Sequence, residues 1–127
     1  MTPQEDARVL LGLVERHLRA LRWNLDPAYP DEEWGFTAQQ AVEKLLKISI
    51  VLRDERPPLT HLLGRLSQAA DIELDPLLFA LQPYAVEARY AAGPFPLPAS
   101  KETILQRVEQ LHDAIQGRLE QMDDAEG

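Results

Sequence analysis

The sequence predicts an all-α fold, an antiparallel, up-and-down bundle of four to five helices. Apolar residues recur at intervals of three and four over most of the chain, which is the period of one helix face. A capping residue stands next to a proline or an acidic residue at several expected helix starts. No segment alternates apolar and polar residues as a half-buried strand does.

The composition is typical of one globular domain spanning residues 1–127, with 45% hydrophobic and 27% charged residues. The chain has no cysteine, which excludes disulfides and thiolate metal sites and suits a reducing compartment. No apolar run approaches the ~20 residues that span a bilayer, and the first residues lack the plan of a secretory signal. We therefore expect a cytoplasmic protein that does not bind membranes.

The net charge of −8 argues against sequence-blind binding of nucleic acid, and DNA is not an expected partner. A local basic pocket for RNA or a nucleotide remains compatible with this charge. Ten of the 13 basic residues are arginines, which suit bidentate contacts with phosphate. A genome that favours arginine codons explains the same bias equally well.

The first helix is expected to begin after Thr2, which can cap it, with Pro3 in its first turn and Glu5 completing a capping box. Its apolar face consists of Leu10, Val14, Leu18, Leu21 and Leu25. The segment 26–30 ends this helix, because each of its prolines disfavours helix in the residue before it. Three arginines on another side form either a solvated face or a phosphate-binding strip: Arg16, Arg19 and Arg22.

The second helix is expected from Asp31, which can cap it, to about Arg53. One face is apolar throughout: Trp34, Ala38, Ala41, Val42, Leu45, Ile48 and Leu52. Phe36 and Ile50 fall on the opposite side at about 100° per residue, so both sides should be buried. We expect one side to pack on the bundle and the other on a second surface, for which a twin subunit is the simplest candidate.

Polar side chains interrupt the second apolar side of this helix. Gln40, Glu43 and Lys47 lie along one line of the helix surface, and Lys44 flanks them. We call these four residues the polar row. Because these polar groups are embedded in an otherwise apolar surface, we expect any reaction of the protein in the stretch that begins within this helix, residues 39–65.

The remaining helices follow from their caps. Thr60 can cap a third, short helix over residues 61–70, with Leu62, Leu63 and Leu66 buried. Asp75 and Pro76 begin a fourth helix that Pro83 should kink. Its inner set is Leu77, Leu78, Leu81, Tyr84, Ala85 and Ala88.

The chain ends with a loop and one long helix. Three alternating prolines between residues 93 and 99 favour a stiff, extended loop. Ser100 caps the last helix, expected over residues 100–122, after which the acidic end should fray. Its apolar side is Ile104, Val108, Leu111, Ile115, Leu119 and Met122. The core of the domain is expected over residues 31–92.

Several kinds of site are absent from the sequence. The six glycines are scattered, so no phosphate-binding loop or dinucleotide fingerprint is present. No serine stands in a nucleophile elbow, and the three histidines are too far apart in sequence for a metal-ligand pattern. We therefore expect no metal and no cofactor.

Arg56 and His61 are the candidate catalytic residues, with four residues between them. Pro57 and Pro58 restrict the connector and lower the entropy lost in holding both side chains together. A neutral histidine in the first turn of a helix can act as a general base beside a bound phosphate, and an arginine can stabilise charge on phosphorus. The alternative is an exposed turn arginine and a histidine bonded to nearby backbone.

Three segments together resemble the HEPN family of small helical proteins: GFTAQQAVEKLLKISI, PPLTHLLGRL and PYAVEARY. The resemblance covers residues 31–90 and implies a dimer with a cleft where the motifs of both subunits meet. It also implies that Arg56 and His61 match the arginine and histidine of metal-independent ribonucleases. Gln40, Glu43 and Lys47 would then support the cleft, and Arg89 would contact phosphate.

Small stand-alone members of this family often pair with a minimal nucleotidyltransferase as toxin and antitoxin, so the resemblance implies such a partner. In some pairs the partner adds AMP to a tyrosine two residues after the histidine, a position that is Leu63 here. Two hypotheses follow. The protein is a dimeric binding module for a nucleotide, RNA or a nucleotidyltransferase, or it is an endoribonuclease toxin that uses Arg56 and His61.

Overall fold

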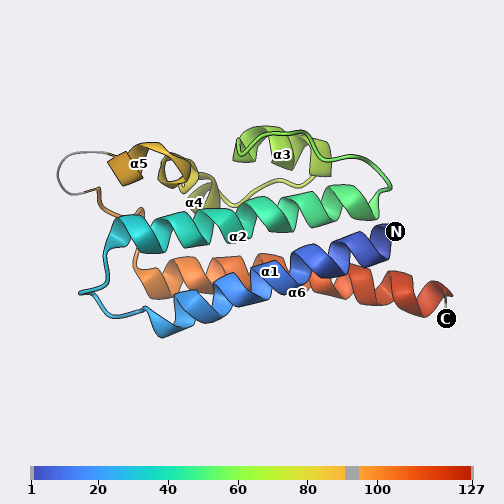
Figure 1. Cartoon of the computed structure of the whole chain (residues 1–127), viewed down its shortest axis with the longest axis horizontal. Helices are drawn as coiled ribbons and strands as arrows, with labels where there is room; N and C mark the ends of the chain where they lie inside the picture. The colour runs from blue at the N-terminus through green and yellow to red at the C-terminus, as the bar shows by residue number, and fades with distance from the viewer. Residues whose placement is uncertain (1, 91–94, 127) are drawn as a thin grey trace.

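Three long helices lie side by side and form the main layer: α1 (Pro3–Trp23), α2 (Asp31–Leu52) and α6 (Lys101–Glu126). The structure, a computed structural model, describes residues 2–90 and 95–126. In Figure 1, α1 runs opposite to α2 and α6, and both chain ends lie at the same end of the molecule. The described residues contain no strand, so the predicted all-α bundle is confirmed.

The predicted helix caps are confirmed at three starts. The Thr2 hydroxyl accepts from the Glu5 amide at 3.1 Å, and the Ser100 hydroxyl accepts from the Thr103 amide at 3.1 Å. Asp75 accepts from the Leu77 amide at 2.9 Å. The prediction for Asp31 was wrong, because Asp31 is the first residue of α2 and Pro30 occupies the capping position without a side-chain bond.

The predicted core faces of the long helices are largely buried. All seven residues predicted on the first face of α2 are buried, and Val14, Leu18 and Leu21 of α1 lie against them. From α6 the core receives Ile104, Val108, Ile115 and Leu119. Among the described residues, no helix is both long enough and apolar enough to cross a membrane.

A second, thinner layer of short helices covers the other side of α2 (Figure 1). It consists of α3 (Leu63–Ala70), α4 (Pro76–Phe79), the 3-10 helix η1 (Gln82–Ala85) and α5 (Glu87–Tyr90). This layer contributes Leu63, Leu66, Leu78 and Leu81 to the core, and Ile50 of α2 is only 1% exposed. The second surface expected for α2 is therefore supplied by its own chain, so the burial of that side does not require a twin subunit.

The fourth helix was predicted wrongly as one kinked helix. Pro83 has no amide N–H, the Tyr84 amide donates to Leu81 at 3.0 Å, and Val86 has φ −138°. The segment is therefore divided into α4, η1 and α5. The last helix continues to Glu126 instead of fraying after residue 122, and the loop predicted over 93–99 is described only from Phe95.

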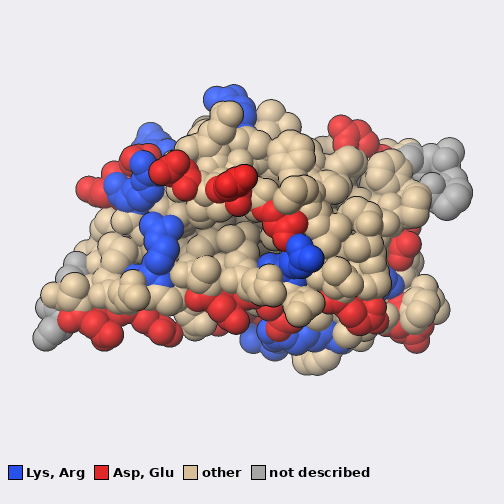
Figure 2. Space-filling view, turned by 180° about the vertical axis from the view of Figure 1, so that it is seen from behind, with Lys and Arg blue, Asp and Glu red and all other residues tan. Residues whose placement is uncertain are grey.

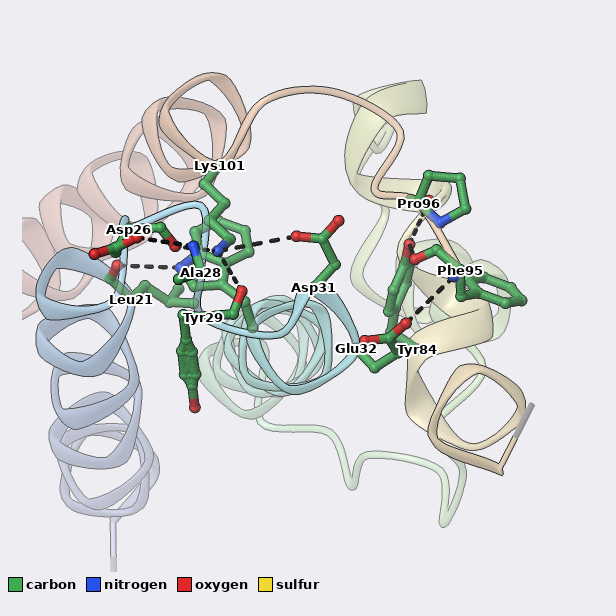
Figure 3. A network of polar contacts seen from close by, with 11 residues as sticks. Leu21, Asp26, Ala28, Tyr29, Asp31, Glu32, Tyr84, Phe95, Pro96 and Lys101 are labelled. Atoms are coloured by element: carbon green, nitrogen blue, oxygen red, sulfur yellow. Dashed lines mark hydrogen bonds and ion pairs between the residues drawn. The ribbon is translucent and has the colours of Figure 1, made fainter. Parts of the chain in front are cut away.

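Two polar contacts lie on opposite sides of the start of α2 (Figure 3). Lys101 of α6 is 6% exposed, and its ammonium donates to the carbonyls of Asp26 at 2.8 Å and Tyr29 at 2.7 Å. The Tyr84 hydroxyl donates to the carbonyl of Pro96 at 2.6 Å, with the carbonyl of Phe95 at 3.1 Å. The first contact joins α6 to the α1–α2 loop, and the second joins η1 to the segment before α6.

Candidate functional site

The connector between α2 and α3, residues 53–62, carries both candidate catalytic residues. It begins with Asp54 in a left-handed conformation (φ 58°), and the amides of Asp54 and Glu55 donate back to Val51 and Ile50. These two bonds close the end of α2 in a Schellman motif. Arg56 and His61 are both exposed on this connector.

His61 does not lie in a helix, contrary to the prediction. α3 begins at Leu63, and Thr60 accepts from the Leu62 amide at 3.1 Å ahead of it. The Leu63 amide instead donates to the Gln82 side chain at 2.7 Å. The proposed influence of a helix N-terminus on the imidazole therefore has no structural basis, and Leu62, predicted to be buried, is 47% exposed.

Arg56 lies in an acidic hollow. This hollow, about 370 Å³, is lined by Arg56, Pro57, Val51 and Pro3 together with three carboxylates, Asp6, Asp54 and Glu55. One guanidinium among three carboxylates gives this hollow a net negative charge at neutral pH. The hollow by itself is therefore a poor place for a phosphate.

His61 lines a different hollow of about 270 Å³, together with Leu62, Gln82, Ala85, Val86 and Glu87. Neither hollow contains both candidate residues. The two candidate catalytic residues therefore line separate hollows of the described chain.

The polar row lies on α2, where Lys44 acts on His17 of α1 and Gln40 bonds to Gln39, which in turn bonds to the connector. Lys47 pairs with Glu43 at 3.4 Å, with the Lys47 side chain 25% exposed. Glu43 is buried, and its second oxygen has no hydrogen-bond partner among the described residues. Burial lowers the pKa of Lys44, and Lys47 lowers it further against the opposing effect of Glu43. These residues are therefore held close to the surface in a partly dry setting.

Sequence reasoning missed Gln39, which connects the polar row to the connector. The side chain of Gln39 is fully buried and donates to the carbonyl of His61 at 3.3 Å. It accepts from Gln40 at 2.8 Å, and Gln40 accepts from Lys44 at 3.1 Å. The helical spacing could have predicted that Gln39 is buried, because Leu46 and Ile50, seven and eleven residues further on, lie on the same side of the helix.

Arg89 belongs to α5, but its side chain lies outside what the structure describes. The predicted phosphate contact at this residue therefore stays a prediction. Elsewhere in the described chain, no group of three or more His, Asp or Glu side chains could hold a metal ion.

Much of the arginine charge is balanced locally. Four arginines form ion pairs with carboxylates: Arg8 with Asp123, Arg22 with Glu109, Arg53 with Glu55 and Arg107 with Asp75. On the face drawn in Figure 2, Lys and Arg stand in separate groups, and Asp and Glu gather along the lower edge. The predicted arginine row of α1 is exposed, as a solvated face would be.

Comparisons with known proteins place the chain in a family. Residues 15–118 match the HEPN domain. No curated protein and no solved structure matched the chain significantly. The matched segment covers most of the chain and includes α2, the polar row, the connector and the short-helix layer. This protein is therefore a member of the HEPN domain family.

Proposed function

We propose that this HEPN-domain protein binds a phosphate-bearing ligand, a nucleotide or a short RNA segment, in a cleft that a second copy of the chain completes. The observation that supports it is the hydrogen-bonded chain from Lys44 through Gln40 and Gln39 to His61. This hydrogen-bonded chain connects the half-buried ammonium of Lys44 with the backbone carbonyl of the exposed His61. Ammonium groups in a partly dry setting bind phosphate more strongly than solvated ones do.

The lysines of the polar row are the expected phosphate contacts. Arg56 is surrounded by carboxylates, whereas Lys44 and Lys47 share a single acidic neighbour, Glu43. Lys44→Met and Lys47→Met should each weaken ATP binding about tenfold or more, because a charged hydrogen bond contributes about 1.5–3 kcal/mol. Isothermal titration calorimetry measures this loss. Arg19→Met, on the exposed row of α1, is the matched control and should bind as the unmodified protein does.

An exposed apolar groove beside His61 supports the proposal that a second copy of the chain binds there. Leu62, Phe79 and Val86 are 47%, 50% and 48% exposed. The hollow that contains His61 shares Leu62 and Gln82 with a neighbouring hollow over α3 and α4. The two hollows form one groove with an apolar middle, and such a surface is typical of an interface.

The groove carries opposite charges at its two ends, so it can pair with the same groove of a second copy. Arg65 lines the hollow on one side of Leu62, and Glu87 lines the hollow on the other side. A two-fold axis through the middle brings Arg65 of one copy to Glu87 of the other, because equivalent patches meet in a two-fold dimer. Analytical ultracentrifugation should show a dimer that Arg65→Glu weakens and that the exchange Arg65→Glu with Glu87→Arg restores. A monomer at all concentrations tested would contradict the two-copy cleft.

A nucleotidyltransferase is the protein partner that we propose. The acidic balance of the chain, with a net charge of −8, favours a basic partner surface. Co-expression with the nucleotidyltransferase encoded nearest to this chain and purification through a tag on one partner test the pair. A stable complex supports the proposal, and failure of the two proteins to co-purify at low salt counts against it.

A second candidate is a metal-independent endoribonuclease, because Arg56 and His61 are both exposed on a connector that two prolines restrict. His61 would take the proton from a ribose 2′-hydroxyl, whose oxygen attacks the neighbouring phosphorus while the 5′-oxygen leaves and takes up a proton. The products are a 2′,3′-cyclic phosphate and a 5′-hydroxyl end. Arg56 would stabilise the charge on phosphorus from across the two-fold axis.

RNA cleavage separates the two candidates. An endoribonuclease cleaves RNA in the presence of EDTA and loses that activity in both Arg56→Ala and His61→Ala, while circular dichroism shows intact helices. Cleavage that EDTA abolishes, or that both variants retain, would remove this candidate. ATP or RNA binding without any cleavage supports the binding module.

A further inference from the structure

We propose that Gln39 is the positioning residue for His61, and that Lys44 fixes the orientation of Gln39 through Gln40. This inference deepens the proposed function and rests on it for its effect on ligand binding. Gln39 is 0% exposed, and a buried amide is costly unless its donor and acceptor are both bonded. Both of its polar atoms are used, the nitrogen toward His61 and the oxygen toward Gln40.

The order of donors and acceptors permits only one arrangement of this chain. The Lys44 ammonium can only donate, so it requires the oxygen of Gln40 on its side at 3.1 Å. The nitrogen of Gln40 then faces the oxygen of Gln39 at 2.8 Å. The nitrogen of Gln39 is left to donate to the carbonyl of His61 at 3.3 Å, and that carbonyl can only accept. A donor at one end and an acceptor at the other therefore fix both amides.

The hydrogen-bonded chain from Lys44 to His61 anchors a part of the connector that lies outside any helix. His61 precedes α3, while the next two amides are bonded to Thr60 and Gln82. The carbonyl of His61 is bonded to Gln39 and thus to α2, the most buried helix of the bundle. The direction in which the imidazole leaves the backbone depends on this peptide group.

The chain also couples a ligand contact to the histidine. The Lys44 ammonium has three N–H groups, so it can contact a phosphate and keep its bond to Gln40. A bound phosphate holds Lys44 in place and so stabilises the orientation of both amides. The polar row and His61 therefore respond to the same ligand.

Hydrogen exchange of the backbone amides of residues 60–63 tests the positioning role without any ligand. Gln39→Glu has nearly the same shape but cannot donate to the His61 carbonyl when it is ionised, and Gln39→Leu removes both bonds. At pH 8, exchange in both variants should be about threefold to tenfold faster, as expected for the loss of one hydrogen bond. Ser49→Ala is the matched control, because Ser49 is another buried polar residue of α2 that bonds instead to Arg118 at 2.6 Å.

Exchange at residues 60–63 that is unchanged in Gln39→Glu and Gln39→Leu would overturn the proposal. Acceleration in Gln39→Leu but not in Gln39→Glu, at a pH where NMR shows the new carboxyl to be ionised, would also overturn it, because it would indicate a packing role only. For the coupling, Gln39→Leu should weaken ATP binding in the unmodified background and have no further effect in His61→Ala. An unmodified protein that fails to bind ATP would remove the proposed function, while the exchange rates would still decide the positioning role.

Discussion

The long helices and the short-helix layer differ in how they are built. The long helices α1, α2 and α6 are uninterrupted from end to end and bury regular rows of side chains. The layer from α3 to α5 is divided by Pro83 and by the non-helical Val86, and it leaves Leu62 and Phe79 half exposed. The difference teaches that regular helices bury their apolar residues more completely than a layer divided into short helices does, and the short layer leaves large apolar side chains exposed.

The contact that joins the two regions gives the largest expected effect. A Cβ at Gly35 of α2 would lie 2.3 Å from the ring of Tyr84, which packs directly on the glycine. Gly35→Ala should therefore lower the free energy of unfolding by about 2–3 kcal/mol, because the ring must leave its place. Thermal denaturation followed by circular dichroism measures the loss.

The matched control is Gly12→Ala in α1, where a Cβ meets nothing within 4 Å. This variant should be up to about 1 kcal/mol more stable than the unmodified protein, since alanine is the better helix former. If both substitutions change the free energy of unfolding by the same amount, then Tyr84 of the short layer does not pack tightly against Gly35 of α2.

Lys101→Met gives the next largest effect and tests the long-helix region alone. The variant leaves the carbonyls of Asp26 and Tyr29 buried beside an apolar side chain, at a cost of about 2 kcal/mol. Arg8→Met removes an exposed ion pair between α1 and Asp123 of α6 and should cost less than about 1 kcal/mol. Urea denaturation of both variants checks the order, and a larger loss for Arg8→Met would contradict it.

The sequence predicted the long helices well because periodicity and caps are local. Thr2 of α1 and Ser100 of α6 stand within three residues of the amides that they accept from. The buried rows of α1 and α6 follow from spacing alone. These features need no knowledge of how the chain folds back on itself.

The short layer and the candidate site could not be predicted in the same way. Leu62 is exposed because α3 begins only at Leu63, whose amide donates to the side chain of Gln82 in η1. Gln39 is buried because the connector returns over it and presents the carbonyl of His61. Both outcomes depend on contacts between residues far apart in sequence, which periodicity does not encode. The separation of Arg56 from His61 likewise depends on the path of the connector.

Tyr84→Phe gives a smaller effect and tests how the short layer is held at its far end. Removing the hydroxyl leaves the Pro96 carbonyl without its donor and should cost about 1 kcal/mol at pH 7. Burial raises the pKa of Tyr84 to about 12, with Asp31 and Glu32 adding to the shift. Because the unfolded tyrosine loses its proton near pH 10 and the folded one near 12, the unmodified protein should lose this part of its stability as the pH rises from 10 to 12. Urea denaturation of Tyr84→Phe should lack this loss.

His17 gives the smallest expected effect and tests the long-helix region next to the polar row. Burial lowers the pKa of His17 below 6.5, and the charges of Lys44 and Arg16 lower it further. The unfolded state therefore binds a proton at a higher pH than the folded state does, so stability should fall as the pH drops below about 6.5. His17→Gln should flatten this part of the pH profile in urea denaturation between pH 5 and 8.

The same titration tests which of the two regions holds the ligand. A phosphate bound at Lys44 would offset the repulsion that His17 experiences and raise its pKa toward 6.5. Saturating ATP should therefore make the unmodified protein less sensitive to acid, and this difference should be absent in Lys44→Met. An acid sensitivity that ATP leaves unchanged, in a protein that binds ATP, would show that the phosphate does not reach the polar row. The ligand would then belong to the groove of the short layer, where Arg65 is the nearest candidate contact.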